Sequence, residues 1–426
     1  MQKIVSPARS LKGSVRLPGD KSISHRAAML ASIAEGRSTL LNYSTGEDCQ
    51  STLACMRGLG VSIQRDDTTI TIDGVGLDGL KPPPAPLDAG NSGSTIRMLS
   101  GILAGQPFQT TIAGDESLSR RPMQRIMTPL AAMGAKLDAR DGKFPPLMIE
   151  GKHPLNAIDY TPPMASAQVK TCVLFAGLYA DGISSVHEAV RTRDHSEMAL
   201  REFGASVTTK GDVISIEGRP ALKGREFQVP GDLSSAAFFL VGALLVPDSR
   251  ILIENVGMNP TRTALLDYLT SLGAFIRIRR IEQVSGEMVG DLEISHGPTR
   301  PGVIEGALTA GLIDEIPVLA VLGAASGGLT VRDAAELRVK ETDRIATLEE
   351  NFRRAGVRIE TRPDGFTVEG GQKFNATEFD SRGDHRIAMA FSVASLIASG
   401  VCKIEEAQAA SVSFPEFYNH LERLAS

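Results

Sequence analysis

The chain has 426 residues, of which 42% are hydrophobic and 22% are charged, as in an ordinary globular protein. This length predicts about two domains, each large enough to bury its own core. A formal net charge of -5, from 45 basic and 50 acidic residues, argues against nucleic acid or an anionic membrane surface as a partner.

Cysteine and histidine spacing gives no indication of a metal site. The four cysteines and seven histidines follow none of the usual ligand spacings. The first residues contain no apolar segment of the kind that directs export, and the longest apolar run, residues 236–246, is far shorter than the roughly 20 residues of a membrane helix. We therefore expect a cytoplasmic protein with reduced thiols, no membrane span and no metal.

A polar helix-start cluster recurs along the chain, and each copy is followed by an apolar, small-residue stretch and a strand. The clusters begin at Asp20, Asn91, Ser166, Asp232, Asp314 and Asp384. Asp, Asn and Ser are the side chains that cap helix N–H groups. The stretches 27–34, 236–246, 316–325 and 387–398 are apolar almost all round, which predicts helices buried on every side.

An amphipathic helix that ends at a glycine follows in five of the units. These helices contain Leu53, Leu130, Leu200, Leu269 and Phe352. Glycine just past a helix end is the expected C-cap, and alternating strands such as residues 69–73 come next. The sequence therefore predicts an α/β (α+β) fold built from one unit repeated six times.

The sixth unit is incomplete, because its amphipathic helix, residues 414–424, ends the chain. Residues 3–17 are the best candidate for its missing strand. We therefore predict a discontinuous domain of residues 1–19 and 230–426, with units four, five and six, and a second domain of residues 20–229, with units one to three. The Pro-Gly pairs near Asp20 and Pro230 would act as hinges, with the active site in the cleft between the domains.

Lys21 stands out when the copies are compared, since the matching residue after Asp232 is Leu233. Helix N-termini favour anions, and a capped helix start explains Asp20 but not a neighbouring lysine. The spacing of a nucleotide-binding phosphate loop is absent. Other cations fall at comparable places in the repeat: Arg26, Arg97, Arg120, Arg121, Arg193, Lys340, Arg344 and Arg386.

Two carboxylates lie among these cations, Asp314 and Glu341. Asp314 could simply cap a helix, and Glu341 could simply pair with Arg344 three residues on. Acid–base chemistry is the other interpretation, because cations keep nearby carboxylates ionised and in place. The spacing alone leaves both open.

Five motifs together resemble the 5-enolpyruvylshikimate-3-phosphate synthase family over the whole chain and in order. They are Leu-Pro-Gly-Asp-Lys-Ser-Ile-Ser-His-Arg at 17–26, Gly-Asn-Ser-Gly-Ser-Thr-Ile-Arg at 90–97, Arg-Arg-Pro-Met at 120–123, Arg-Val-Lys-Glu-Thr-Asp-Arg at 338–344 and Asp-His-Arg-Ile-Ala-Met at 384–389. The resemblance implies an enolpyruvyl-transferase fold of two domains with three βαβαββ units each, buried helices and outer sheets. It also implies a cofactor-free enzyme of chorismate and aromatic amino acid biosynthesis, which we expect to be a monomer.

The resemblance also assigns residues to two substrates. Shikimate 3-phosphate would bind to Lys21, Ser22, Arg26, Ser166, Gln168, Arg193, Asp314 and Lys340. Phosphoenolpyruvate would bind to Lys21, Asn91, Gly93, Arg121, Gln168, Glu341, Arg344, His385 and Arg386. Asp314 would accept the proton of the attacking 5-hydroxyl, while Glu341, with Lys21, would protonate the methylene carbon and later remove that proton.

Several positions depart from the better-known branch of the family and resemble its second class. Ala167, Arg193, Glu336 and Val412 replace a serine, a tyrosine, an asparagine and a lysine, so Glu336 and Val412 are left out of the site. Members with alanine at the position of Gly93 tolerate the herbicide glyphosate. The glycine of this chain therefore predicts sensitivity.

Two alternatives compete with this assignment. The related transferase that acts on UDP-N-acetylglucosamine usually carries a cysteine in the loop that corresponds to residues 115–123 and an asparagine after its first lysine; this chain has neither. A non-catalytic protein that binds phosphorylated metabolites would gain nothing from the carboxylates of Asp314 and Glu341.

Overall fold

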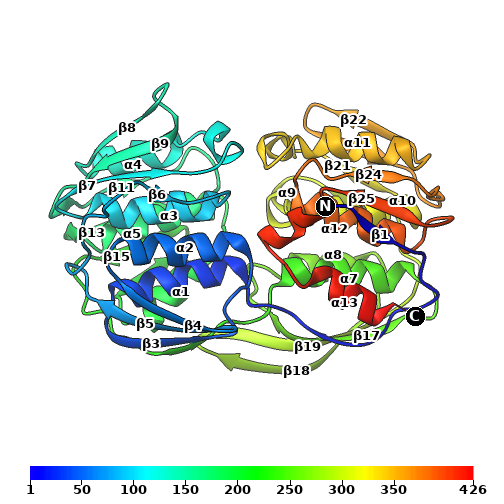
Figure 1. The fold of residues 1–426 in the computed structure, drawn as a ribbon, viewed down its shortest axis with the longest axis horizontal. Coiled ribbons are helices and arrows are strands. Elements are labelled where there is room, and N and C mark those ends of the chain that lie inside the picture. The colour runs from blue at the N-terminus through cyan, green and yellow to red at the C-terminus, as the bar shows by residue number, and fades with distance from the viewer. Residues whose placement is uncertain (426) are drawn as a thin grey trace. The chain divides into compact units, whose positions relative to one another are not determined.

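The computed structural model describes residues 1–425, which divide into two compact units. Unit 1 contains residues 1–18 and the chain from residue 230 onward, and unit 2 contains residues 19–229 (Figure 1). Each unit is described by itself below.

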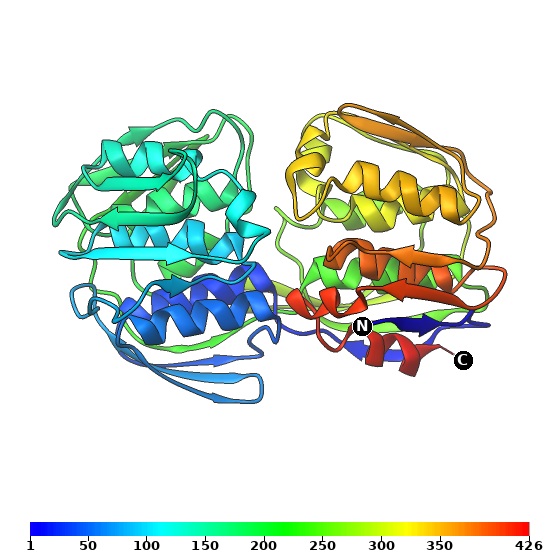
Figure 2. The ribbon, with the colours of Figure 1, turned by 45° about the horizontal axis from the view of Figure 1, so that its top comes forward.

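Three buried helices form the interior of each unit. In unit 2 they are α1 (Lys21–Ile33), α3 (Gly93–Ala104) and α5 (Ala167–Gly177), and in unit 1 they are α7 (Leu233–Leu245), α10 (Ile316–Ala325) and α12 (His385–Ser395). Their small, apolar side chains are buried on all sides, as the sequence predicts. Strands lie around the outside of these helices in both units (Figure 2).

A second helix accompanies each buried one. These helices are α2 (Glu47–Gly58), α4 (Gln124–Ala132), α6 (His195–Glu202), α8 (Ala264–Ser271), α11 (Arg344–Arg354) and α13 (Phe417–Leu424). Gly60, Gly134, Gly204, Gly273 and Gly356 follow the first five with φ between 77° and 102°. This left-handed backbone is the reason for glycine there. The short helices are α9 (Ala307–Leu312), η1 (Leu118–Arg120), η2 (Ala335–Val339) and η3 (Ala407–Val412).

Four of the six expected caps are confirmed. The side chains of Asp20, Ser166, Asp232 and Asp384 each accept a backbone N–H at the start of a buried helix. The other two expectations were wrong by one residue, because α3 is capped by Ser92 and α10 begins after Glu315.

The side chain of Asn91 is instead engaged with Asp115 and Arg121. In α10, Pro317 has no N–H, so fewer donors at that helix start need a cap. Asp314 is therefore not the N-cap residue, and this part of the simple interpretation of Asp314 does not hold.

The sheets of unit 2 repeat one pairing pattern, in which a first strand lies parallel to a second and the third and fourth follow antiparallel. In sheet order they are β16 (Glu226–Gln228), β3 (Glu35–Leu41), β5 (Thr69–Val75), β4 (Ser62–Asp66); β6 (Leu87–Asp88), β7 (Gln109–Ala113), β9 (Phe144–Glu150), β8 (Lys136–Arg140); and β11 (Asp159–Tyr160), β13 (Ile183–His187), β15 (Val213–Glu217), β14 (Val207–Lys210). A small sheet joins β10 (Leu155–Asn156) to β12 (Ala180–Asp181).

Unit 1 repeats the same pattern. Its sheets are β2 (Lys12–Arg16), β17 (Arg250–Gly257), β19 (Glu287–Ser295), β18 (Ile276–Val284); β20 (Gly302–Ile304), β21 (Leu329–Val331), β23 (Gly365–Val368), β22 (Ile359–Arg362); and β24 (Glu378–Asp380), β25 (Cys402–Glu405), β1 (Lys3–Val5). In chain order the first five copies follow the βαβαββ plan that the resemblance implied, whereas the sixth has three strands, one of which is β1 from the start of the chain.

The expected strand at residues 3–17 is correct only in part. β1 completes the sixth sheet, where Lys3 lies opposite Ile404, but β2 joins the sheet of β17. β16, which precedes α7, pairs in turn with β3. The first and fourth repeats therefore exchange their first strands, at the two points where the chain passes between the units, near residues 18 and 229. Pairing between distant segments decides this, and no local signal encodes it.

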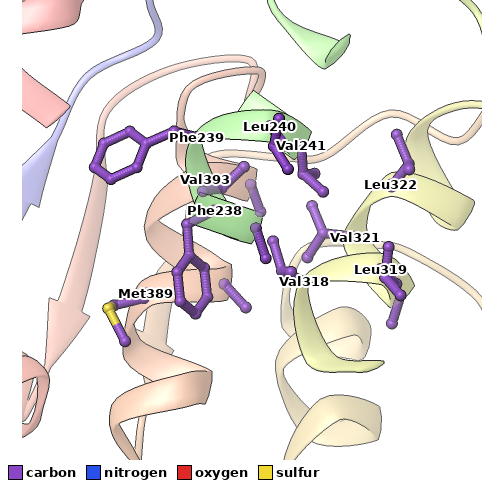
Figure 3. Close-up of a cluster of buried hydrophobic side chains, with 14 of the residues drawn as sticks. Phe238, Phe239, Leu240, Val241, Val318, Leu319, Val321, Leu322, Met389 and Val393 are labelled. Atoms are coloured by element: carbon purple, nitrogen blue, oxygen red, sulfur yellow. The ribbon is translucent and has the colours of Figure 1, made fainter. Parts of the chain in front are cut away.

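Each unit has its own hydrophobic core. In unit 1, Phe238 and Val241 of α7 face Val318 of α10 and Met389 and Val393 of α12 (Figure 3). Packing in the core fixes the position of each buried helix within its unit. The starts of these helices carry most of the predicted site residues. None of the helices within residues 1–425 combines the length and the hydropathy that a bilayer-spanning helix requires.

Candidate active site

The start of α1 holds Lys21 beside a carboxylate that the sequence reasoning missed. Lys21 Nζ lies 2.9 Å from Oδ2 of Asp48, and the two side chains are 16% and 7% exposed. Asp48 lies in the first turn of α2, where a negative charge also interacts favourably with the helix dipole. The ion pair therefore holds the lysine at the helix start.

Arg26, one turn further along α1, is almost fully buried. Its Nε donates to Ser196 Oγ at 2.7 Å, and its terminal nitrogens donate to Thr171 Oγ1 and to the carbonyl of Ser22, both at 2.7 Å. Arg26 thus ties α1 to α5 and α6. Ser22, another predicted ligand, is half-buried and supplies a carbonyl to this arrangement.

His25 shares this polar interior. Its Nδ1 lies 2.6 Å from Thr52 Oγ1, and the ring is completely buried. Burial lowers the pKa of His25 well below its ordinary value, and the positive charges of Lys21 and Arg26 lower this pKa further. The imidazole is therefore neutral near pH 7.

Asn91, Gly93 and Arg121 lie together at the start of α3. One terminal nitrogen of Arg121 donates to Asn91 Oδ1 and to Ser117 Oγ, both at 3.0 Å. A Cβ added to Gly93 would lie 2.8 Å from an Arg97 guanidinium nitrogen and 3.5 Å from one of Arg121. The glycine therefore leaves room for both guanidinium groups.

Gln168 connects α5 to α3 near its start. Its Oε1 accepts from Arg97 at 2.8 Å, and its Nε2 donates to Ser94 Oγ at 3.0 Å. Ser166 caps α5, and Arg193 lies half-buried in the segment before α6. Arg97 was noted in the sequence as a repeat cation but was not predicted as a site residue.

Arg344 is the centre of the group in unit 1. Its side chain is 1% exposed; Nε lies 2.8 Å from Asp384 Oδ2, one terminal nitrogen lies 2.7 Å from Glu341 Oε2, and the other lies 3.7 Å from Asp314 Oδ1. Burial acts to lower the pKa of Arg344, but the carboxylates of Asp384, Glu341 and Asp314 outweigh it and raise that pKa. The predicted pairing of Glu341 with Arg344 is confirmed.

Asp314 and Lys340 lie at the edge of this group. Lys340 Nζ is 3.8 Å from Asp314 Oδ1 and 3.3 Å from Glu336 Oε1. Asp314 is 22% exposed, so its carboxylate lies between two cations and remains accessible. Glu336, which the sequence reasoning left out, is thus a direct neighbour of Lys340. Val412 ends η3.

His385 and Arg386 open α12, after Asp384. Asp384 is fully buried and accepts the backbone N–H of Arg386 at 2.8 Å while it also binds Arg344. The Arg386 guanidinium donates to the carbonyl of Ser234 at 3.3 Å and lies over the ring of Phe238, 5.9 Å from its centroid. His385 is buried.

A second buried network lies behind Asp314. Ser234 donates to Glu315, and Arg262 donates to Ser234 and lies 3.6 Å from Asp232 Oδ1. All four side chains are less than 9% exposed. Neither Glu315 nor Arg262 was expected at the site. Within residues 1–425, His, Cys, Asp and Glu side chains form no group of three or more that could hold a metal ion.

Comparisons with known proteins identify the family of the chain. The family model of EPSP synthase (3-phosphoshikimate 1-carboxyvinyltransferase) matches residues 5–421. The 3-phosphoshikimate 1-carboxyvinyltransferase of Solibacter usitatus is 63% identical, with 100% of both chains covered, and that of Gloeobacter violaceus is 48% identical, with 99% of this chain and 98% of the relative covered.

Solved structures are similar over the same length. An EPSP synthase from Acinetobacter baumannii has a TM-score of 0.89 and 40% identity, with coverage of 100% of this chain and 98% of that one. The enolpyruvyl transferase NikO from Streptomyces tendae has a TM-score of 0.78 at 17% identity, covers 99% and 97%, and supports the fold alone.

The fold defines the class of protein, a mixed α/β enolpyruvyl transferase. The chain belongs to the EPSP synthase family, and its activity is that of a 3-phosphoshikimate 1-carboxyvinyltransferase in aromatic amino acid biosynthesis. The family match decides against both the UDP-N-acetylglucosamine transferase and the non-catalytic binding protein.

Proposed function

We propose that the chain transfers the enolpyruvyl group of phosphoenolpyruvate to the 5-hydroxyl of shikimate 3-phosphate. The observation that carries the assignment of roles is Arg344, whose guanidinium lies among Asp314, Glu341 and Asp384. One buried cation thereby joins both proposed acid–base groups to the start of α12.

The first step is addition. Asp314 accepts the proton of the 5-hydroxyl as its oxygen attacks C2 of phosphoenolpyruvate, and Glu341, with Lys21, delivers a proton to C3. The product is a tetrahedral intermediate that still carries phosphate. Support comes from the accessible carboxylate of Asp314, which lies beside Lys340 and Arg344.

The second step is elimination. A proton leaves C3 for Glu341 as the C2–O bond to phosphate breaks, which forms the new enol ether and inorganic phosphate. Arg121, Arg344 and Arg386 surround the phosphate in this proposal and stabilise the charge that develops on it.

The other proposed contacts follow the two helix-start groups. In unit 2, Lys21, Ser22, Arg26, Ser166, Gln168 and Arg193 hold shikimate 3-phosphate, and Asn91 and Gly93 lie by phosphoenolpyruvate. In unit 1, Lys340 binds the ring, and His385 lies by phosphoenolpyruvate. The starts of α1, α3 and α5 also direct N–H groups toward bound anions.

We assign the chain to the second class of the family on Ala167, Arg193, Glu336, Val412 and the Asp-Glu-Ile-Pro sequence at 314–317. The contact of Glu336 with Lys340 supports a changed environment for that lysine. A monomer in the cytoplasm remains our proposal, and the four unpaired, buried cysteines agree with a reducing compartment.

The decisive assay measures phosphate released from phosphoenolpyruvate with and without shikimate 3-phosphate. We expect release only when both substrates are present, together with an equal amount of the enolpyruvyl product. Phosphate release that does not depend on shikimate 3-phosphate would contradict the proposal.

A further inference from the structure

Lys170 is a buried lysine in α5 that none of the proposed catalytic steps uses. It is 1% exposed, and its Nζ lies 2.7 Å from Glu197 Oε1 and 2.9 Å from Glu188 Oε2. Both glutamate side chains are also buried, at 3% and 7% exposure. We call these three residues the Lys170 triad.

The repeat itself does not require this lysine. Lys170 is the fourth residue after the cap of α5, and the same position in the other buried helices holds an uncharged residue: Ser24, Ile96, Ala236, Leu319 and Ala388. All five are buried. Because burial of charged groups is costly, a lysine in one copy indicates a local role that the shared fold does not supply.

The two glutamates stand at the two ends of one segment. Glu188 directly follows β13 and Glu197 lies in the first turn of α6, so Lys170 holds both ends of residues 188–197 against α5. Glu188 also accepts a hydrogen bond from Thr192, the neighbour of Arg193. The triad thus reaches to within one residue of a proposed phosphate ligand.

The next residue of α5 holds the same segment from a second side. Thr171 Oγ1 and Ser196 Oγ lie 2.6 Å apart, and both accept hydrogen bonds from Arg26. Lys170 therefore binds the two glutamates, and Thr171, the next residue of α5, binds Arg26 and Ser196. Arg193 lies on the chain between these fixed points.

Residues of the segment also line a cavity. It has a volume of about 390 Å³ and is lined among others by Glu188, Arg191, Asp194, Glu197 and Asp212. Oε2 of Glu197 has no hydrogen-bond partner among residues 1–425, so the contact with Lys170 holds that carboxylate. Beside this cavity, the segment is held by its charged contacts with Lys170.

We propose that Lys170, Glu188 and Glu197 are positioning residues that set the segment carrying Arg193 and Ser196 for the phosphate of shikimate 3-phosphate. The inference rests on the proposed function, because it assumes that Arg193 meets this phosphate. Without the lysine, two buried carboxylates would face each other, repel and displace the segment. Phosphoenolpyruvate binding and the acid–base groups lie outside this effect.

The test compares Lys170→Met and Glu188→Gln with the parent enzyme in the phosphate-release assay, and adds calorimetric titration with shikimate 3-phosphate alone. We expect the KM and Kd for shikimate 3-phosphate to rise about tenfold or more, the size of one weakened charge-assisted contact. The kcat and the KM for phosphoenolpyruvate should change less than about twofold, a split that a general loss of structure would not produce.

Two controls separate the possible causes. Lys136→Met removes an exposed lysine of unit 2 that pairs with Glu150 at 2.7 Å, and it should leave every constant unchanged. Lys170→Arg keeps the charge and should recover most of the affinity for shikimate 3-phosphate.

Three results would overturn the inference: an unchanged KM for shikimate 3-phosphate in folded Lys170→Met, an equal loss for both substrates, or failure of both test variants to fold. If both variants fail to fold, the Lys170 triad is needed for folding and has no separate positioning role. The parent enzyme tests the proposed function independently, through its dependence on shikimate 3-phosphate.

Discussion

Asp384 Oδ2 lies 2.8 Å from Nε of Arg344, and the two side chains are 0% and 1% exposed. The same carboxylate accepts the N–H of Arg386 at 2.8 Å through its other oxygen. One buried residue therefore fixes two cations that we propose for phosphoenolpyruvate, although it contacts no substrate in the proposed mechanism.

Replacing that carboxylate should weaken phosphoenolpyruvate binding. Asp384→Asn removes the charge that holds Arg344, so we expect the KM for phosphoenolpyruvate to rise about tenfold to a hundredfold, in line with a loss of ~1.5–3 kcal/mol. Steady-state kinetics with each substrate varied would measure it. Asp343→Asn is a suitable control, since Asp343 caps α11 at a more exposed position, and its KM should stay near the parent value.

The two proposed acid–base carboxylates should be needed for turnover more than for binding. We expect Asp314→Asn and Glu341→Gln each to lower kcat by about a hundredfold or more, the range for general acid–base groups. Calorimetry should find the affinity for shikimate 3-phosphate largely kept. Glu336→Gln serves as the control, because it changes a neighbouring carboxylate that has no proposed role. Full activity of both Asp314→Asn and Glu341→Gln would refute the acid–base roles of these two residues.

Gly93 should determine the response to glyphosate. The parent enzyme should be inhibited strongly at millimolar glyphosate, whereas in Gly93→Ala the added methyl group, 2.8 Å from an Arg97 nitrogen, must displace a guanidinium group and should raise the inhibitory concentration. Inhibition curves for parent and variant, recorded together with the KM for phosphoenolpyruvate, would measure the change in inhibitory concentration. Gly311→Ala is a matched change, since its Cβ meets Ala264 at an ordinary 3.5 Å. Unchanged parent activity at millimolar glyphosate would count against the prediction.

Stability should fall in mild acid because of His25. Its folded-state pKa is depressed mainly by burial, so the unfolded chain binds a proton that the folded chain does not, and the stabilisation is present above about pH 6.5 and lost below it. This one histidine lowers the free energy of unfolding by up to ~1.4 kcal/mol per pH unit in that range. Denaturant unfolding from pH 7.5 to 5.5 should therefore show a shallower loss in His25→Gln. An identical pH dependence in parent and variant would disprove the role of His25.

The sequence by itself determined the repeated elements. Capping side chains, apolar helices without a polar face and glycines after helix ends are local signals, and they located α1, α5, α7 and α12 and the helices that follow them. Comparison of the copies also identified Lys21 as a residue that the scaffold does not need. These inferences succeed because each depends on a few neighbouring residues.

The tertiary structure alone decided which distant residues meet. The exchange of β2 and β16 between repeats, the burial of Asp384 against Arg344 and the contact of Asp48 with Lys21 join segments far apart in sequence. The contacts of Lys170 with Glu188 and Glu197 are also decided by the tertiary structure, because nothing in the sequence distinguishes Lys170 from an ordinary helical lysine. Only the packed interior, where a charge must find a partner, reveals what it binds.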